Sequence, residues 1–342
     1  MSKPTVHDIA REAGVSLATV DRVLNARPGV RTKTVERVQA AVRRLGYVRN
    51  THAANLARQR QYRFAFVLPE GPSQFVETLR LSLAETLDAK TDERLTVTVV
   101  PAPANDPYTV VRTLKRLSHS RTDGVALMLP ETPQVRDAVA RMKSAGMAVV
   151  TLVSDLPHAP RDHFVGINSY SAGRTAAQLM GRFIGDRGGD VLVVTNTLQA
   201  RDSLERRLGF DAVMAAEFGQ LRAMPTVEAY DDPDRMRQIV ERVVSGNPRI
   251  AGAYSMGSGN TPLLQGLRAS GRIGDLVVVA HELTPVTRQA LVAREIDAVI
   301  NQNVGHLVRS ALRVLRARAD RTPIFEAQER IRTDIVIREN LP

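Results

Sequence analysis

A segment near the N-terminus carries residues that could read a base sequence. Arg22 follows Leu17, Ala18 and Asp21 within two helical turns. A guanidinium can donate to both O6 and N7 of guanine, a contact worth about 1 to 3 kcal/mol of discrimination between bases. Neighbouring hydroxyl side chains could bind phosphates, which position a protein on DNA without reading its sequence. Arg22 could equally be an ordinary surface cation. The helices that position Arg22 therefore determine whether base readout is the better interpretation.

A second set of residues, most of them polar, follows short apolar segments in the rest of the chain. Carboxylates accept hydrogen bonds from hydroxyl groups, arginine donates two directed bonds, and an aromatic ring can cover a sugar face, so this set suits a polyhydroxyl ligand. The set comprises Gln74, Phe75, Glu131, Ser154, Asp155, Asn168, Arg201, Asp202, Gly257, Asn260, Glu282 and Gln302. Any one of them could instead cap a helix or lie on the surface, most readily Asp155 and Asn168.

Arg22 lies in the second of three predicted helices. Ser16 is a suitable N-cap for that helix, and Gly14 and Gly46 end the helices on either side. Apolar residues recur at helical spacing, and those expected to be buried are Val6, Ile9, Ala10, Ala13, Val20, Val23, Leu24, Val35, Val38, Val42 and Leu45. Two short helices with a Gly-containing turn form a helix-turn-helix, whose second helix enters the major groove. The predicted DNA-binding residues of this unit are Thr5, Ser16, Leu17, Ala18, Thr19, Asp21, Arg22, Asn25, Arg27, Thr32 and Thr34.

The charge distribution favours a duplex nucleic acid as partner. Residues 1–61 contain 12 Lys and Arg and 4 Asp and Glu, which gives +8 of the total charge of +11. Clustered cations neutralise phosphates and release counterions. Aromatic residues make up only 4% and Trp is absent, which disfavours a single-strand binder that stacks bases. Because there is no Cys and no apolar run of membrane-spanning length, we expect a cytoplasmic protein without disulfides, metal, cofactor or secretory signal.

The N-terminal sequence resembles the headpiece of the lactose-repressor (LacI/GalR) family of bacterial transcription regulators. The resemblance runs through residues 5–16 (TVHDIAREAGVS), 18–20 (ATV) and 22–25 (RVLN), and continues to Leu45-Gly46-Tyr47. Residues 49–58 resemble the family's hinge helix, which orders on operator DNA and inserts a leucine into the minor groove; the matching contacts are Asn50, Ala53 and Leu56. Paired insertion implies a homodimer, although a flexible linker is the alternative. Asp21 departs from the family's usual Ser, and Arg49 from its usual Pro.

From residue 62 onward, short apolar strands alternate with helical stretches. Strands are predicted at 64–68, 95–100, 124–129, 148–152, 191–195, 250–254 and 277–280, with helices near 75–89, 107–118, 133–145, 172–184, 203–218 and 235–244. This alternation predicts an α/β body of two doubly wound parallel-sheet lobes. Open α/β sheets bind ligands at the carboxyl ends of their strands, where the second set of residues lies.

The body resembles the effector domain of the same family, which is similar to periplasmic sugar-binding proteins. The resemblance implies an all-α headpiece at 1–47, a hinge at 48–61, and an effector-binding and dimerisation domain at 62–342. Its first lobe is expected at about 62–163 and 298–325, and its second at about 164–297 and 326–342. By motif position, Arg201, Glu282 and Gln302 match the family's hydroxyl-binding residues. The absence of an acidic residue at 254–260, and His281 where an aromatic is common, depart from the sugar-binding pattern.

The two resemblances predict a ligand-responsive, DNA-binding transcriptional regulator. The expected form is a repressor of a carbohydrate or polyol operon that binds a pseudo-palindromic operator as a homodimer. A corepressor-dependent or activating regulator with a non-sugar effector is the alternative. An enzyme is disfavoured because the GSG run at 257–259 lacks the third Gly of a dinucleotide loop and His281-Glu282 lacks zinc-binding spacing. A transport receptor would leave the basic headpiece unexplained, and an architectural DNA-binding protein would respond to no small molecule.

Overall fold

The computed structural model describes residues 4–24, 28–47, 61–71, 73–89, 94–103, 106–257 and 259–342. They belong to two compact units, Met1–Arg60 and Gln61–Pro342. Five predicted DNA contacts lie outside the described residues, namely Asn25, Arg27, Asn50, Ala53 and Leu56, as does nearly all of the predicted hinge. None of the helices in the described ranges combines the length and apolarity that a bilayer span requires.

The N-terminal unit consists of three helices around a small core. The helices are α1 (Val6–Ala13), α2 (Leu17–Leu24) and α3 (Thr32–Leu45), and the side chains of Ile9, Val20 and Val38 are fully buried between them. Thr5 and Asp8 form a capping box at the start of α1, and Gly14, with φ of 60°, ends it. The prediction that Val6 is buried is wrong: it is 38% exposed, so the packed face of α1 begins one turn later.

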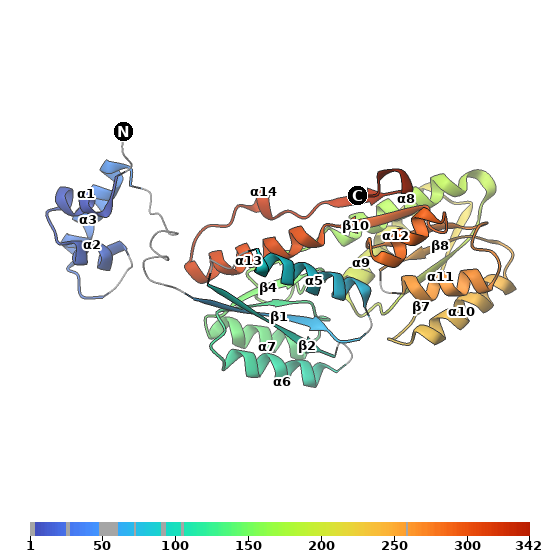
Figure 1. Ribbon diagram of the computed structural model, residues 1–342, viewed down its shortest axis with the longest axis horizontal. Coiled ribbons are helices and arrows are strands. Elements are labelled where there is room, and N and C mark those ends of the chain that lie inside the picture. Colours follow the sequence, from blue (N-terminus) through green and yellow to red (C-terminus); the bar gives the residue numbers. More distant parts are fainter. Residues whose placement is uncertain are drawn as a thin grey trace. The chain divides into compact units, whose positions relative to one another are not determined.

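The first sheet of the larger unit is parallel throughout, in the order β2-β1-β3-β4-β5. Its strands are β1 (Tyr62–Pro69), β2 (Leu95–Ala102), β3 (Gly124–Leu127), β4 (Ala148–Leu152) and β5 (His163–Val165). Helices α6 (Pro107–Ser118) and α7 (Pro133–Ser144) cover one face, while α5 (Gln74–Asp88) and α13 (Val304–Asp320) cover the other (Figure 1). Burial on both faces explains why the inner strands β1, β3 and β4 are mostly apolar runs. The edge strand β2, with the sequence LTVTVVPA, alternates instead and is only partly buried.

The second sheet has the order β11-β10-β9-β8-β6-β7, and only β11 is antiparallel to its neighbour. Its strands are β6 (Gly189–Thr195), β7 (Leu221–Glu228), β8 (Ile250–Ser255), β9 (Val277–His281), β10 (Ala298–Gln302) and β11 (Thr333–Val336). Helices α8 (Ser169–Ile184) and α9 (Arg201–Glu217) cover one face; α10 (Pro233–Gly246), α11 (Asn260–Ala269) and α12 (Pro285–Val292) cover the other (Figure 1). Short helical turns occur at α14 (Glu326–Glu329), Gly185–Arg187 and Arg338–Asn340.

Two lobe boundaries need correction. β5 pairs with β4, so the first sheet extends to Val165 rather than ending near residue 163. β10 pairs with β9 and β11, so residues 298–302 belong to the second sheet. Most residues of this apolar strand are buried there. The chain returns to the first lobe only with α13, which contacts β3, β4 and α5. The exchange of segments between lobes is therefore as expected, but it occurs after the strand rather than before it.

A close contact between α8 and α9 fixes the backbone beside the second sheet. Gly173 and Gly209 face the opposite helix, where a Cβ on Gly209 would lie 2.1 Å from the Tyr170 carbonyl oxygen and one on Gly173 would lie 2.0 Å from that of Arg206. Only glycine permits this approach. The contact holds the α9 segment that carries Arg206 against α8.

Candidate DNA-binding and ligand-binding sites

The outer face of α2 presents the residues predicted to read bases. Leu17 is 42% exposed, and Ala18, Asp21 and Arg22 are also exposed, whereas Val20 on the opposite side is fully buried. This division is what a recognition helix requires, since the buried side holds the helix on its unit while the exposed side is free to enter a groove.

The start of α2 offers polar groups suited to phosphate oxygens. The Thr19 amide donates to Ser16 Oγ at 3.2 Å, which confirms Ser16 as N-cap, and the two hydroxyls lie 2.9 Å apart. Helix N-termini and short hydroxyl side chains are common phosphate-binding groups. Thr32 is exposed at the start of α3 and Thr34 is half-buried in its first turn. The Thr5 hydroxyl, in contrast, already donates to Asp8 Oδ2 at 2.7 Å, so its contact with DNA would be additional.

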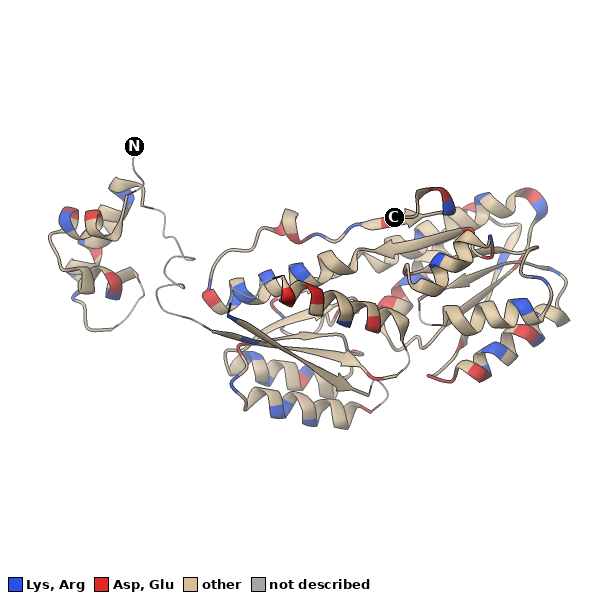
Figure 2. Ribbon diagram, viewed as in Figure 1, with Lys and Arg blue, Asp and Glu red and all other residues tan. Residues whose placement is uncertain are grey.

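Some of the positive charge of this unit holds the turn between helices. The Arg37 guanidinium donates to the carbonyl oxygens of Ala13 and Gly14, at 2.5 and 3.4 Å, and Arg44 pairs with Glu12 at 2.6 Å. In the larger unit, cations and anions are interspersed over the helices (Figure 2). The net positive charge is therefore concentrated in the N-terminal residues and not in the larger unit.

The carboxyl ends of the second sheet bring five predicted ligand residues together. Glu282 follows β9, Gln302 ends β10, Asp202 lies in the first turn of α9 after β6, and Gly257 and Asn260 follow β8. The Gln302 side-chain amide donates to Glu282 Oε1 at 2.7 Å, and that of Asn260 donates to the His281 carbonyl oxygen at 2.9 Å. All but Asp202 and Gly257 are buried, and the Asp202 side chain is only 13% exposed.

Arg206 is the arginine at the centre of this group, and sequence analysis missed it. Its side chain is 2% exposed; Nη1 donates to the Met256 carbonyl at 2.6 Å, and the guanidinium lies 3.5 Å from both Asp202 Oδ2 and Glu282 Oε1. The absence of a side chain at Gly257 provides space for the Arg206 guanidinium, because a Cβ at this position would lie 3.0 Å from Arg206 Nη1. The sequence feature that could have identified Arg206 is its helical spacing, which puts it on the buried face of α9 with Ser203 and Phe210.

Arg201, which was predicted for this role, does not join the group. It is the first residue of α9 and pairs with Glu205 one turn later, at 2.6 Å. Residues at helical positions 201 and 206 differ by five, so their side chains leave the helix on different sides. The structure therefore places Arg206 rather than Arg201 beside Glu282.

The backbone at Glu282 has a conformation unusual for glutamate. Its φ is 69°, in the left-handed region, and its carbonyl oxygen accepts from the Thr287 hydroxyl at 2.8 Å. Such strain costs on the order of 1 to 3 kcal/mol and is found where a side chain must be aimed precisely. Burial raises the pKa of the Glu282 carboxyl to about 7, although the Arg206 guanidinium and the Gln302 amide act in the opposite direction.

Several buried polar atoms in this group have no hydrogen-bond partner among the described residues. They are Arg206 Nε, Ser255 Oγ, Asn260 Oδ1, His281 Nδ1, Glu282 Oε2 and Gln302 Oε1. Leaving a buried donor or acceptor unsatisfied costs about 1 to 3 kcal/mol, so a cluster of them requires an explanation. Hydroxyl groups can both donate and accept, so a polyhydroxyl ligand could satisfy acceptors and donors of this group together.

His281, the residue that departs from the usual sequence pattern, supports the floor of the group. Its Nε2 atom lies 2.8 Å from the Tyr254 hydroxyl, and the Tyr254 ring stacks on Phe210 at 4.5 Å between centroids. Burial lowers the pKa of His281 well below its usual value, so the ring is neutral at physiological pH. His281 is therefore packed beneath Glu282 as a neutral hydrogen-bonding group.

The first lobe contributes one residue that faces this group. Ser154 follows β4 and is buried, and its Oγ accepts from the Asp202 amide of the second lobe at 3.4 Å. The two lobes therefore meet next to Arg206. Phe75, half-buried in the first turn of α5, packs against the core cluster that extends into both lobes, while Gln74 is exposed.

Three other predicted residues, Asp155 and Glu131 of the first lobe and Asn168 of the second, serve local structure. Asp155 accepts from the Thr151 hydroxyl and the Leu156 amide and pairs with Arg161, and these partners lower the pKa of its carboxyl despite burial. Glu131 accepts from the His158 amide at 2.9 Å. Asn168 caps α8 through the Ser171 amide at 2.8 Å. The observed contacts of Asp155 and Asn168 agree with the alternative given for them, a structural role rather than ligand binding.

No group of three or more His, Asp or Glu side chains in the described part of the chain is arranged to hold a metal ion. The site is thus built from hydrogen-bonding groups on two open α/β lobes, and the smaller unit from a helix-turn-helix. This combination defines a class of protein in which a DNA-reading unit is joined to a bilobal small-molecule receptor.

Comparison with known proteins identifies the family. Residues 5–50 match "Bacterial regulatory proteins, lacI family", and residues 64–322 match "Periplasmic binding protein domain". The chain belongs to the LacI family of bacterial transcriptional regulators, with a periplasmic-binding-protein-like effector domain.

Its relatives include regulators of several kinds. It is 27% identical to the HTH-type transcriptional regulator DegA of Bacillus subtilis over 177 residues, which are 52% of this chain and 51% of DegA. It is 38% identical to the maltose regulon regulatory protein MalI of Escherichia coli over 88 residues, 26% of each chain. The aligned part thus spans about half or less of these relatives.

Solved structures confirm the fold. A glucose-galactose binding protein of Geobacillus stearothermophilus, GanP, superposes with a TM-score of 0.72 at 15% identity, over 83% of this chain and 99% of that one. A putative LacI transcriptional regulator of Bacteroides fragilis gives 0.70 at 16% identity, over 82% and 98%. At these identities the likeness establishes architecture alone.

Proposed function

We propose that this regulator represses a carbohydrate or polyol operon by binding a pseudo-palindromic operator as a homodimer, and that a small polyhydroxyl effector bound between its lobes controls that binding. The observation that carries the effector is the buried group of Arg206, Glu282, Gln302 and Asn260, with its unsatisfied donors and acceptors at the carboxyl ends of the second sheet. The observation that carries DNA binding is the exposed face of α2, with Leu17 to Arg22.

The chemistry of the group favours a neutral ligand with several hydroxyls. Three of its unpartnered atoms, Asn260 Oδ1, Glu282 Oε2 and Gln302 Oε1, are acceptors while the Glu282 carboxyl is ionised, and Arg206 Nε is a donor. A carboxylate or phosphate offers acceptors alone and would meet these oxygens unfavourably. The relative named for the maltose regulon supports a sugar.

Control of DNA binding would follow from lobe closure. Ser154 of the first lobe and Asp202 of the second meet beside Arg206, so a ligand bound there would contact both lobes. A ligand shifts a conformational equilibrium only by its differential affinity for the two states, typically about 1 to 3 kcal/mol of coupling. The same architecture accommodates a corepressor, for which the effector would tighten operator binding, and this is the alternative function.

A thermal-shift screen of sugars and polyols tests the effector assignment. A compound that binds the native protein raises its apparent stability by about 2.7 kcal/mol at 100 times its Kd. We expect at least one compound to stabilise the wild type and to lose its effect in Gln302→Ala. The matched control is Gln289→Ala, on α12 away from the group, which should keep the shift. A shift that persists in Gln302→Ala would refute this placement of the ligand.

A further inference from the structure

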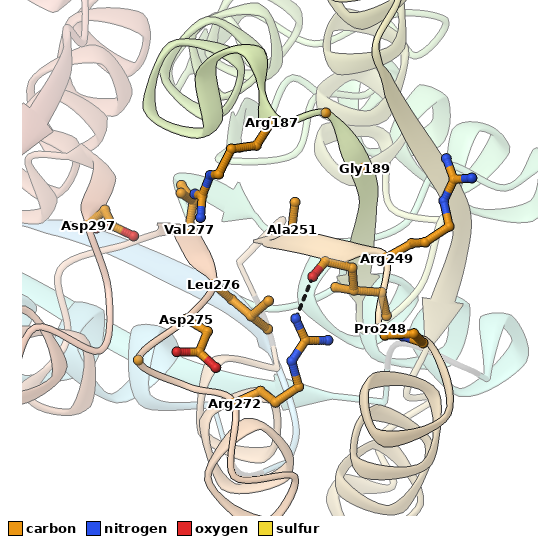
Figure 3. Close-up of a pocket in the computed structure, with 13 residues that line it drawn as sticks. Arg187, Gly189, Pro248, Arg249, Ala251, Arg272, Asp275, Leu276, Val277 and Asp297 are labelled. Atoms are coloured by element: carbon orange, nitrogen blue, oxygen red, sulfur yellow. Dashed lines mark hydrogen bonds between the residues drawn. The ribbon is translucent and has the colours of Figure 1, made fainter.

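A hollow of about 870 Å³ lies at the edge of the second sheet opposite the group around Arg206. It is formed where β6, β8 and β9 begin, and Asp297 before β10 also lines it (Figure 3). These four strands are neighbours and parallel, so the loops that precede them converge at one edge. The hollow is therefore separated from the proposed effector site by the length of the sheet.

Three arginines line this hollow: Arg187, Arg249 and Arg272. Over the described ranges, none of the three forms an ion pair, whereas Arg222 and Arg268 of the same lobe pair with carboxylates at 2.8 and 2.6 Å. Exposed guanidinium groups that have no carboxylate partner are a usual means of binding phosphate, which each can hold through two parallel hydrogen bonds.

The loops that carry these arginines are held in place. Arg272 donates to the carbonyl oxygens of Asn247 and Ile250, at 3.2 and 2.9 Å, and its side chain extends toward the centre of the hollow (Figure 3). The Asn247 side chain accepts from the Arg249 amide at 3.0 Å and donates to the buried Asp190 at 2.9 Å. Because both Nη atoms of Arg272 already donate to backbone carbonyls, Arg272 stabilises the wall of the hollow, and the exposed Arg187 and Arg249 side chains remain to bind a ligand.

Two carboxylates complete the lining and restrict the ligand further. Asp275 and Asp297 lie on one side of Arg272, and Arg249 lies on the other (Figure 3). Asp297 Oδ2 accepts from the Val278 amide at 2.7 Å, which fixes that carboxylate. Carboxylates repel a plain polyanion but accept hydrogen bonds from hydroxyl groups. We propose that the hollow binds a small molecule with both a phosphate group and hydroxyls, of the kind of a sugar phosphate, independently of the effector between the lobes.

Isothermal titration calorimetry of the full chain with ribose 5-phosphate and with inorganic phosphate tests this site. The test variant is Arg187→Gln/Arg249→Gln, because both side chains are exposed and neither is paired with a carboxylate in the described structure. The matched control is Arg235→Gln/Arg242→Gln, which removes two exposed charges from α10, outside the hollow. We expect saturable binding of one ribose 5-phosphate per chain, weaker binding of phosphate, and at least a tenfold loss of affinity in the test variant alone.

Glu282→Gln separates this proposal from that of the effector site. Binding of ribose 5-phosphate should be unchanged in Glu282→Gln, because that residue lies at the other edge of the sheet. Three results would overturn the site: no saturable binding of either phosphate, equal losses in the test and control variants, or binding that depends on Glu282 and not on Arg187 and Arg249. The last would place the phosphate between the lobes.

Discussion

At the scale of single residues, the site depends on a charged group whose role is determined by burial. Glu282 lies within reach of Arg206, but the contact is 3.5 Å and Asp202 competes for the same guanidinium at an equal distance. Desolvation therefore outweighs attraction and raises the pKa of Glu282 to about 7. The carboxyl is poised to change its charge when a ligand changes its surroundings.

This shift makes stability depend on pH. The folded pKa of Glu282 exceeds the unfolded value near 4.5, so the folded state binds more protons between the two values. Its contribution is present in full below pH 4.5 and is lost as pH rises through about 7, a change of about 3 kcal/mol at most. Urea unfolding at pH 5 to 8 should show that Glu282→Gln removes this part of the pH dependence and is relatively more stable at pH 8. Parallel pH profiles for wild type and variant would contradict the assignment.

Arg206 and Arg201 provide a direct comparison of two arginines on one helix. Removing one partner of a buried ion pair costs roughly 3 to 5 kcal/mol, because the remaining charge is left uncompensated. We expect Arg206→Gln to lower the free energy of unfolding by an amount of this order and to abolish stabilisation by the effector. Arg201→Gln, which removes a half-exposed pair with Glu205, should change stability by less than about 1 kcal/mol and leave the effector shift intact. Equal effects in chemical denaturation would show that Arg206 has no special role.

Chemistry at the strand ends could be predicted, but the particular arginine could not. Parallel strands place their carboxyl ends at one edge, so Glu282 and Asn260 followed from the pattern of strands, whereas Gln302 followed from the family resemblance. Arg206 lies a full turn inside α9, where its position depends on the packing of Gly173 against its carbonyl and on the space left by Gly257. Contacts of this kind are set by tertiary structure and leave only a weak trace in the sequence.

At the scale of elements, we expect α2 to be the helix through which the protein reads a base sequence. Arg22 and its neighbours are on the exposed side, held by the burial of Val20. Arg22→Ala should weaken binding to the cognate operator by about 1 to 3 kcal/mol and binding to random duplex by much less. Fluorescence anisotropy with both duplexes at one salt concentration measures the ratio. An equal loss on the two duplexes would make Arg22 a phosphate contact only.

The α8 and α9 pair is the element contact on which the effector site rests. Gly209→Ala would force a Cβ to within 2.1 Å of the Tyr170 carbonyl oxygen, so the helices must separate. Overpacking of this kind typically costs about 1 to 3 kcal/mol, and here the obstacle is backbone. Gly219→Ala, which meets no atom within 4 Å, is the control and should leave the melting temperature nearly unchanged. A Gly209→Ala protein as stable as the control would mean that the helices can part without cost.

The sequence predicted elements with strong periodicity and missed weak ones. β7, at the edge of the second sheet, has the sequence LRAMPTVE and only its first residue is buried, so no apolar run marks it. β10 was placed with the first lobe because the family resemblance put the crossover near residue 298, and the sequence of a strand does not identify the strand with which it pairs. The three headpiece helices, by contrast, were predicted from the sequence, since their caps and apolar stripes are local.

At the scale of the whole molecule, a bilobal receptor and a DNA-reading unit are useful together only if ligand and DNA influence each other. Linkage requires that such influence be reciprocal: an effector that weakens operator binding must itself bind less tightly to the operator complex. The proposed group at Arg206 lies where the lobes meet, through Ser154 and Asp202, and is thus placed to respond to their arrangement.

The coupling between effector binding and operator binding is tested most directly by measuring operator affinity with and without effector. The probe is fluorescence anisotropy of the cognate operator with the sugar or polyol that gives the largest thermal shift, on wild type and on Gln302→Ala. We expect a change in Kd of about 5- to 150-fold for the wild type, corresponding to 1 to 3 kcal/mol of coupling, and none for the variant. An effector that stabilises the protein yet leaves the operator Kd of the wild type unchanged would contradict it.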